Sequence, residues 1–379
     1  MAYTTRYNCR KFSLIAAFLL FLQFVQAQDK NNSREYDFTQ VDAWLEDNIS
    51  DLGGRAVLVI LKDGQLLYEQ SFNNMKRSQK AVARYLARRQ GKSTEEAVQD
   101  FSFDTRERIA SCSKWLSAAL VMTFVDDGSL QLEDTLGKFL PVLSANGKGN
   151  ITIWQCLSHL TGIKAGNFRE TQEMMKEIHT MDEAIIQIAR QPMEGPPGKT
   201  FHYSSAGLQL AAAVIEKISG KDFETLFAER IARPCGMTNT DFGHGAVPLP
   251  AGGGWSTAED YIRFLNMILH DGLYNGRRVL SAAAVAAMQK NRVAADAVIA
   301  YTPAEAGNWG YGFGEWVMDD ATGDQRSAAV TSPGLFGSFP WIDRNRDYAA
   351  FLFTFNIHSK GRNDRYKKLK SLVDEALNN

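Results

Sequence analysis

The chain has 379 residues, of which 45% are hydrophobic and 22% are charged, and its formal net charge is -1 at pH 7. This composition supplies enough apolar side chains for a full core and excludes general disorder. The length suits two closely packed subdomains within one protein. A charge this close to zero argues against nucleic acid as the main partner.

Residues 1–27 have the pattern of a signal peptide. Its basic region consists of Arg6, Arg10 and Lys11. An apolar run over 13–25 follows, and small residues around Ala27 predict cleavage there. The run is shorter than the about 20 residues that a membrane-spanning helix needs. We therefore expect a periplasmic or secreted protein without stable membrane insertion, whose mature chain covers 28–379.

The first signals of the mature chain are a helix and a hairpin. Four apolar residues at helical spacing predict an amphipathic helix: Phe38, Val41, Leu45 and Ile49. The apolar stretches 56–60 and 66–72 flank Asp63-Gly64, a strong turn signal for a β-hairpin.

The next segment, 75–99, is predicted to be helical and is strongly basic. Its cationic residues are Lys76, Arg77, Lys80, Arg84, Arg88, Arg89 and Lys92. A solvated surface helix is the ordinary interpretation of such a charge run, and a patch for an anionic ligand is the alternative.

Helical patterns dominate from Ser111 to about Gln289. Helices are predicted over 208–218, which ends at Gly220, and over 258–269, which begins after a Ser-Thr pair. The segment 164–189 is polar and weakly periodic, so it is a candidate lid.

The C-terminal part changes to strands and ends in a helix. The predicted strands cover 311–318, 328–331, 336–342 and 348–355. We expect an α+β fold in which the first hairpin and these strands form one antiparallel sheet, covered by the terminal helices and packed beside the helical middle. The sheet part would comprise about 36–108 and 305–379, and the helical part about 109–304.

Ser111 and Lys114 are the first candidate catalytic residues. Three positions apart at the start of a helix, they would lie on one face, within reach of each other. Unpaired amide groups and the positive end of the helix dipole surround a serine placed there. These conditions suit a serine nucleophile with a lysine partner. The alternative is that Ser111 only caps the helix.

Cysteine and histidine usage points to no metal or cofactor. Cys112, Cys156 and Cys235 remain after signal cleavage and lack metal-ligand spacing. Three buried thiols are expected, and one disulfide is the alternative. Cys112, beside Ser111, is a rival nucleophile, but the i+2 position of Lys114 would face away from it. The histidines, His159 and His202 included, show no paired ligand spacing and are interpreted as structural.

Tyr203 is a second candidate catalytic residue. It follows a Pro-Pro-Gly turn and precedes a predicted helix. A tyrosine could act as a base if a cation such as Lys114 lowered its pKa from about 10. The alternative for this residue alone is a partly buried core tyrosine.

Five segments in order resemble the serine β-lactamase-like family, which includes class C β-lactamases, penicillin-binding proteins and related esterases and D-aminopeptidases. They are Ser111-Cys112-Ser113-Lys114, the turn 126–134, the segment 151–163, the Tyr203-Ser204-Ser205 motif and the Gly-rich segment 252–260. The resemblance extends from Phe38 to the C-terminus and implies the family's fold.

The resemblance also implies roles for individual residues. Ser111 would be the acylated nucleophile, Lys114 its proton partner, and Tyr203 the general base and later the acid. Amides of Ser111 and Leu335 would form the oxyanion hole. Ser205, Ser332 and Gly334 would contact substrate, with Gly334 allowing its close approach to the strand.

Two departures from the family pattern bear on the substrate. Ser205 stands where class C enzymes have asparagine, and Ser332 stands where lysine or histidine is usual. The loss of a cation at Ser332 argues against β-lactam turnover. We therefore expect an exported serine hydrolase, with no cofactor, acting on a small ester or amide that could be peptide-like. The alternative is a penicillin-binding-like protein that binds peptides or cell-wall fragments without hydrolysing them.

Overall fold

The structure is a computed structural model that describes residues 36–89, 91, 93–166, 177–243, 245–356 and 360–378. The predicted signal peptide lies outside the described residues. Among the described residues, no helix is both long and apolar enough to cross a membrane.

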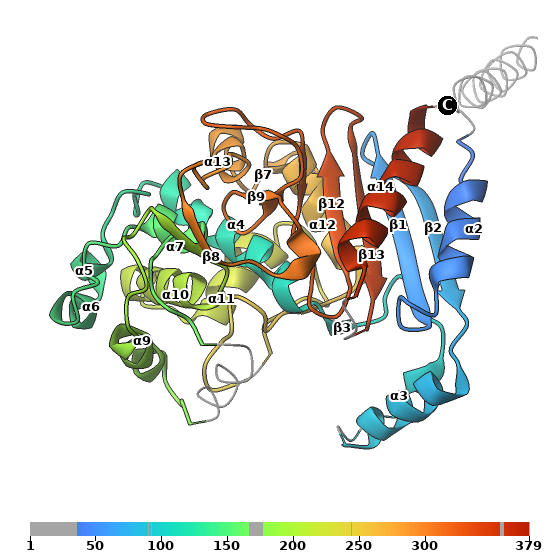
Figure 1. Ribbon diagram of the computed structural model, residues 1–379, viewed down its shortest axis with the longest axis horizontal. Coiled ribbons are helices and arrows are strands. Elements are labelled where there is room, and N and C mark those ends of the chain that lie inside the picture. The colour runs from blue at the N-terminus through green and yellow to red at the C-terminus, as the bar shows by residue number, and fades with distance from the viewer. Residues whose placement is uncertain are drawn as a thin grey trace, which may run out of the picture.

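One antiparallel sheet of seven strands forms the centre of the fold, as the sequence predicted (Figure 1). Its order is β2-β1-β13-β12-β11-β10-β9. The strands are β1 (Arg55–Lys62), β2 (Gln65–Asn73), β9 (Gly310–Tyr311), β10 (Trp316–Val317), β11 (Ala329–Thr331), β12 (Phe339–Asp343) and β13 (Tyr348–Thr354). The turn between β1 and β2 is formed by Asp63 and Gly64, which both have positive φ angles, 52° and 74°. This conformation is the one that a two-residue hairpin requires.

Helices cover both faces of the sheet. The terminal helices α2 (Thr39–Asn48) and α14 (Arg362–Asn378) pack together on one face, as predicted, and α12 (Ala258–Leu269) packs on the other. Because both faces are covered, six consecutive residues of β1 are buried instead of alternating with exposed ones. Two hydrophobic cores result, one on each side of the sheet.

The middle of the chain is mainly helical and packs beside the sheet, so the predicted α+β architecture is confirmed. Its helices are α4 (Ser113–Asp126), α5 (Leu136–Phe139), α6 (Pro141–Ala145), α7 (Ile153–Leu157), α9 (Met181–Arg190), α10 (Ala206–Ser219), α11 (Phe223–Phe227), α12 and α13 (Ala282–Met288). Short strands pair as β3 (Glu107–Arg108) with β5 (Trp255–Ser256), β4 (Thr200–His202) with β8 (Val298–Tyr301), and β6 (Leu273–Tyr274) with β7 (Arg277–Arg278).

Two predicted boundaries agree with the structure in detail. The helix predicted over 258–269 is α12, and the Thr257 hydroxyl caps it by accepting a hydrogen bond from the Asp260 amide at 3.0 Å. The helix predicted to end at Gly220 is α10, whose cap has the left-handed φ of 70°. Both ends carry local signals, a capping hydroxyl and a glycine, that act without tertiary contacts.

Three predicted segments differ from the structure. The strand predicted over 311–318 is divided into β9 and β10, because the glycines between them turn the chain back. The candidate lid 164–189 contains a regular helix, α9, started by a capping box of Thr180 and Glu183. Residues 167–176 of that candidate lid lie outside the described residues. The basic segment 75–99 is helical only in α3 (Arg77–Arg89) and the short turn Glu96–Val98.

Candidate active site

Ser111 lies in a short 3₁₀ turn, Ala110–Cys112, that leads directly into α4. The serine therefore precedes the α-helix, whereas the sequence placed it in the first turn. Ala110 has a φ of 46°, a strained value for a residue with a side chain. The Tyr261 hydroxyl donates to the Cys112 carbonyl at 2.8 Å and ties the turn to α12. Ser111 itself is half-buried.

Lys114 reaches back to this serine. Its Nζ lies 3.1 Å from Ser111 Oγ and donates to the Ala251 carbonyl at 2.7 Å. The side chain is only 3% exposed, and it makes no ion pair among the described residues. Burial lowers the pKa of Lys114 to about 7. Near neutral pH, a large fraction of the molecules therefore carries an uncharged lysine that can accept a proton from Ser111.

Tyr203 completes the cluster from a different part of the chain. It follows β4 and precedes α10, and its ring lies beside Lys114, close enough to Ser111 for the serine hydroxyl to influence its pKa. Lys114 Nζ lies 4.6 Å from the centre of the Tyr203 ring. Burial raises the pKa of Tyr203 above its usual value, against the opposing effect of the nearby Ser111 hydroxyl. The phenol is therefore protonated at neutral pH.

An aromatic cluster holds Tyr203 in place. The Trp316 ring stacks on the Tyr203 ring with centroids 5.1 Å apart, and the His159 ring lies 4.6 Å away on another side. His159 Nδ1 accepts the Ser204 amide at 3.4 Å, and Nε2 lies 3.1 Å from the Tyr311 hydroxyl. Burial and the nearby Lys114 hold the pKa of His159 well below its usual value, so the ring is neutral. This agrees with the structural role predicted for His159.

The loop between β11 and β12 packs directly on the nucleophile turn. Gly334 is placed so that an added Cβ would lie 2.4 Å from the Ile109 carbonyl oxygen and 3.2 Å from Cys112 Sγ. The Ser332 hydroxyl lies 3.2 Å from the Ser111 carbonyl and 3.0 Å from the Gly314 carbonyl, to which it donates. These contacts fix the loop against the turn.

This packing changes the interpretation of two predicted substrate contacts. We expected Gly334 to allow close approach of substrate, but its missing side chain makes room for the backbone of Ile109. Ser332 is 1% exposed and its hydroxyl already has carbonyl acceptors, so its geometry is that of a residue that positions the loop. A direct contact of Ser332 with substrate stays a prediction.

The predicted oxyanion donors lie on the two segments that this packing joins. The neighbouring amides of Cys112 and Gly334 are bonded, to the carbonyls of Ile109 at 3.2 Å and Ser338 at 2.8 Å. The amides of Ser111 and Leu335 make no such bond to another described residue. Two unpaired amides on adjoining turns are the arrangement that an oxyanion site needs.

The remaining predicted residues have less specific surroundings. Ser205 is half-buried immediately before α10. Cys112, Cys156 and Cys235 are free and buried, as expected, and burial raises the pKa of the Cys112 thiol well above its usual value. Cys112 is therefore a poor nucleophile. The described residues contain no group of three or more His, Cys, Asp and Glu side chains that could hold a metal ion.

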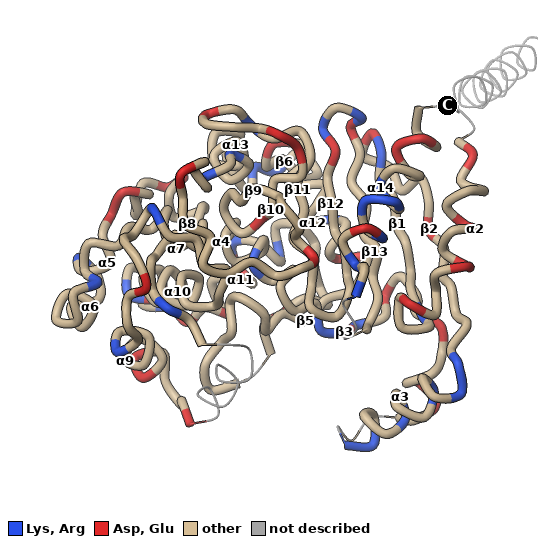
Figure 2. Tube along the Cα trace, viewed as in Figure 1, with Lys and Arg blue, Asp and Glu red and all other residues tan. Residues whose placement is uncertain are grey.

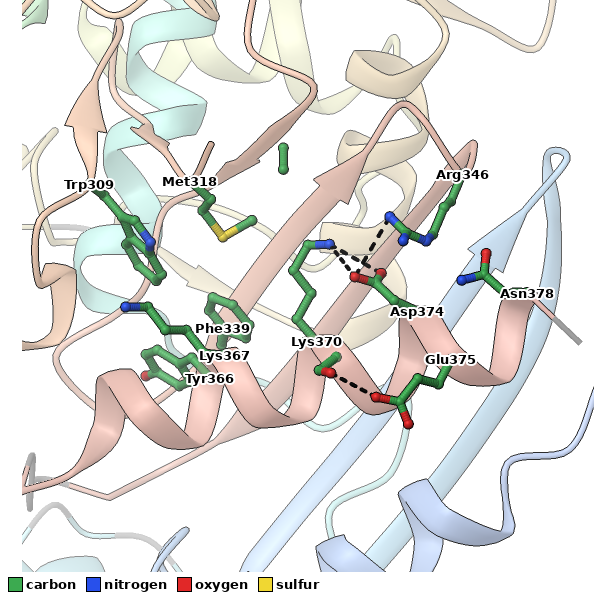
Figure 3. Close-up of a pocket in the computed structure, with 12 residues that line it drawn as sticks. Trp309, Met318, Phe339, Arg346, Tyr366, Lys367, Lys370, Asp374, Glu375 and Asn378 are labelled. Atoms are coloured by element: carbon green, nitrogen blue, oxygen red, sulfur yellow. Dashed lines mark hydrogen bonds and ion pairs between the residues drawn. The ribbon is translucent and has the colours of Figure 1, made fainter. Parts of the chain in front are cut away.

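A pocket of about 440 Å³ lies elsewhere, between α14 and the sheet (Figure 3). It is lined by Trp309, Phe339 and Lys370 among others, and Lys370 is paired with Asp374. None of the predicted site residues lines it. We therefore do not assign catalysis to this pocket.

Comparison with known proteins identifies the family of this chain. The profile of the Beta-lactamase family matches residues 45–372. The chain belongs to the beta-lactamase family. Penicillin-binding protein 4 of Amycolatopsis lactamdurans is 26% identical over 295 residues, which cover 68% of this chain and 74% of that protein.

Solved structures extend the likeness in fold over most of the chain. A beta-lactamase candidate from Bacteroides dorei DSM 17855 has a TM-score of 0.73 and 28% identity, covering 91% of this chain and 100% of that chain. EstCE1, a hydrolase with promiscuous acyltransferase activity, has a TM-score of 0.66 and 19% identity. The match covers 88% of this chain and 97% of that chain. Membership places this protein in a family of serine hydrolases related to penicillin-binding proteins.

Proposed function

We propose that this protein is an exported serine hydrolase that forms an acyl-enzyme on Ser111 and acts on a small ester or amide. The observation that carries the proposal is the 3.1 Å separation of Ser111 Oγ from the Nζ of Lys114, a buried lysine whose pKa is about 7. Export rests on the signal-peptide pattern of residues 1–27, which implies a periplasmic or secreted protein.

The proposed acylation begins with Lys114. The uncharged Nζ takes the Ser111 proton while Oγ attacks the substrate carbonyl carbon, and the amides of Ser111 and Leu335 stabilise the resulting oxyanion. The Oγ–carbon bond forms, the bond to the leaving group breaks, and the leaving group takes a proton from the Tyr203 hydroxyl. Lys114 then returns its proton to Tyr203.

In deacylation, Lys114 takes a proton from water while the water oxygen attacks the acyl carbon. The bond from that carbon to Ser111 Oγ breaks, Oγ takes a proton from the Tyr203 hydroxyl, and the acid is released. Lys114 again returns its proton to Tyr203.

This scheme refines the roles that the family resemblance implied. The resemblance made Tyr203 the general base, whereas the directions of the two pKa shifts favour Lys114 for that step. A phenol with a raised pKa is a poor base at neutral pH, but it can donate a proton and be reprotonated by the adjacent lysine.

Labelling with a fluorophosphonate tests the proposal directly. The expected result is a covalent adduct located on Ser111 by peptide mass spectrometry, and no adduct in Ser111→Ala. Cys112→Ala is the matched control for the neighbouring thiol and should label normally, because Cys112 is buried with a raised pKa. An adduct on Cys112, or labelling that persists in Ser111→Ala, would contradict the assignment.

The pH dependence of kcat/KM tests which group is the base. Protonated Lys114 cannot accept the Ser111 proton, so kcat/KM should fall about tenfold per pH unit below about pH 6 and level off above about pH 8. The midpoint should lie near the lysine pKa of about 7. If Tyr203 had to ionise first, kcat/KM would instead keep rising beyond about pH 9, because its pKa is raised.

The neutral residue at Ser332 bears on the substrate. A hydrogen bond from a charged donor contributes roughly 1.5–3 kcal/mol, compared with about 1 kcal/mol from a neutral donor. The difference corresponds to about a tenfold change in rate. A neutral ester should therefore be hydrolysed more efficiently than a cephalosporin, and Ser332→Lys should narrow that ratio about tenfold for carboxylate-bearing substrates.

Steady-state kinetics with both substrates measures this ratio. Ser332→Ala is the control, because it removes the same hydroxyl bonds to Ser111 and Gly314 without adding charge. Ser332→Ala should change kcat/KM for the ester and for the cephalosporin by the same factor. Efficient cephalosporin hydrolysis by the wild type would show that another group binds the carboxylate.

The natural serine at position 332, in place of the usual lysine or histidine, also favours a second function. A penicillin-binding-like protein that binds peptides or cell-wall fragments without turnover would also tolerate the loss of the cation at Ser332. Such a protein would label at Ser111 once but would hydrolyse no ester in repeated turnovers, so the ratio of product to enzyme distinguishes the two.

A further inference from the structure

We propose that helix α3 (Arg77–Arg89) docks this protein on the surface of an anionic lipid membrane. The helix follows the hairpin strand β2 and lies at the periphery of the molecule, beyond the ends of the sheet strands at the bottom of the view (Figure 1). Its position leaves one long side open to an approaching surface. This function is separate from hydrolysis at Ser111.

The first observation is an exposed apolar face. Val82, Tyr85 and Leu86 are 58%, 57% and 40% exposed, and their spacing places them on one side of the helix. Ala87 is the buried residue of α3. The large apolar side chains of this helix therefore do not attach it to the body of the protein, although burying them would stabilise the fold. Three such residues side by side form a surface suited to an apolar partner.

The second observation is the charge of the same helix. Its cationic residues are Arg77, Lys80, Arg84, Arg88 and Arg89, and α3 contains no acidic residue. Figure 2 shows Lys and Arg positions along α3. Among the described parts of the chain, none of these five side chains forms an ion pair, whereas cations elsewhere, such as Arg263 and Lys370, do. The five cations of α3 therefore form no ion pair among the described residues, although Glu96 lies in the turn that packs against the helix.

The arrangement of the two faces favours a membrane. Residues 80, 84 and 88 recur every fourth position and lie on the opposite side of the helix from Val82. A helix with Lys and Arg on one face and large apolar residues on the other lies in the plane of a lipid interface. Anionic headgroups attract the cations while the apolar face enters the boundary with the acyl chains. A small anionic ligand would satisfy the charges only, because the cations are spread along the helix and do not converge.

Vesicle flotation of the mature chain, residues 28–379, tests this proposal. The protein should float with phosphatidylcholine vesicles that contain phosphatidylglycerol. With vesicles of phosphatidylcholine alone, it should remain in the bottom fraction of the gradient. Binding should be reversible and should weaken with added salt, because much of it is electrostatic. Failure to float with the anionic vesicles at low salt would overturn the proposal.

Two variants separate the contributions of charge and apolar surface. Arg84→Glu with Arg88→Glu should weaken vesicle binding about tenfold or more. Lys367→Glu with Lys368→Glu is the matched control, since it makes the same charge change at exposed positions of α14 and should leave binding within about twofold of wild type. Equal loss in both pairs would mean that net charge, and not α3, governs binding, and would overturn the proposal.

Val82→Ser with Leu86→Ser tests insertion of the apolar face. This variant keeps every charge, and it should also lose vesicle binding. If it bound like wild type while the Arg84 and Arg88 variant did not, α3 would be an electrostatic patch for an anionic macromolecule, and the membrane proposal would be wrong. Hydrolysis of a soluble ester and thermal unfolding should be normal in all variants, which shows that they are folded.

Discussion

Lys114→Ala and Tyr203→Phe should each lower kcat/KM for ester hydrolysis by about 10²–10⁴-fold, which is the usual contribution of a positioned acid or base. In the structure, Lys114 Nζ lies 3.1 Å from Ser111 Oγ and 4.6 Å from the centre of the Tyr203 ring. In the proposed scheme, Lys114 takes the Ser111 proton and Tyr203 protonates the leaving group, so each depends on the other for the return of the proton.

The double variant should lose little more than either single variant. Residues that act as one unit have strongly non-additive effects, because the first substitution already disables the proton transfer to which the second residue contributes. A double-mutant cycle, with kcat/KM measured on one neutral ester, determines the coupling between Lys114 and Tyr203. Additive losses would show that Lys114 and Tyr203 act in separate steps.

Matched controls separate catalysis from folding. Lys148 is also buried, and its Nζ donates to the Ala189 carbonyl at 2.8 Å, remote from Ser111. Tyr348 is a buried tyrosine on the α14 side of the sheet. Lys148→Ala and Tyr348→Phe should lower stability while leaving kcat/KM of the folded enzyme near that of wild type. Near-normal turnover in Tyr203→Phe would contradict its assignment as proton donor.

The fold was predictable where local signals decide it. The Asp63-Gly64 turn fixes the hairpin, Thr257 starts α12, and Gly220 ends α10, each through its own backbone or side-chain preference. The division of 311–318 into two strands was not predictable, because it depends on distant partners. The Phe313 amide bonds to the Met288 carbonyl and the Gly314 amide to the Leu157 carbonyl, which hold the turn.

In the site, too, contacts between residues close in sequence were predictable and contacts between distant residues were not. Ser111 and Lys114 are close in sequence, so helical spacing alone predicted their contact. The Ala251 carbonyl that accepts from Lys114 and the Trp316 ring that stacks on Tyr203 carry no sequence signal for these roles. A backbone carbonyl can be supplied by any residue, and an aromatic residue in a strand is ordinarily interpreted as core.

Gly334→Ala should lower kcat/KM about a hundredfold while the protein remains folded, because a misplacement of about 1 Å in an active site can have this effect. The added Cβ would lie 2.4 Å from the Ile109 carbonyl oxygen, a distance that real contacts do not reach. The loop between β11 and β12 must then move away from the nucleophile turn. The Leu335 amide, one residue further on, would move with it and leave the oxyanion with a single donor.

Gly245→Ala is the matched control for this substitution, because its added Cβ would meet the Val247 carbonyl oxygen at an ordinary 3.5 Å. Gly245→Ala should have the kcat/KM of the wild type in the same assay. The loss in Gly334→Ala should fall on kcat more than on KM, since an oxyanion donor acts mainly in the transition state. Fluorophosphonate labelling of Ser111 should slow in parallel, because that reaction also develops charge on an oxygen held by the two amides. A normal labelling rate with normal turnover would show that the loop accommodates the methyl group and that the Leu335 amide is not a donor to the reacting oxygen.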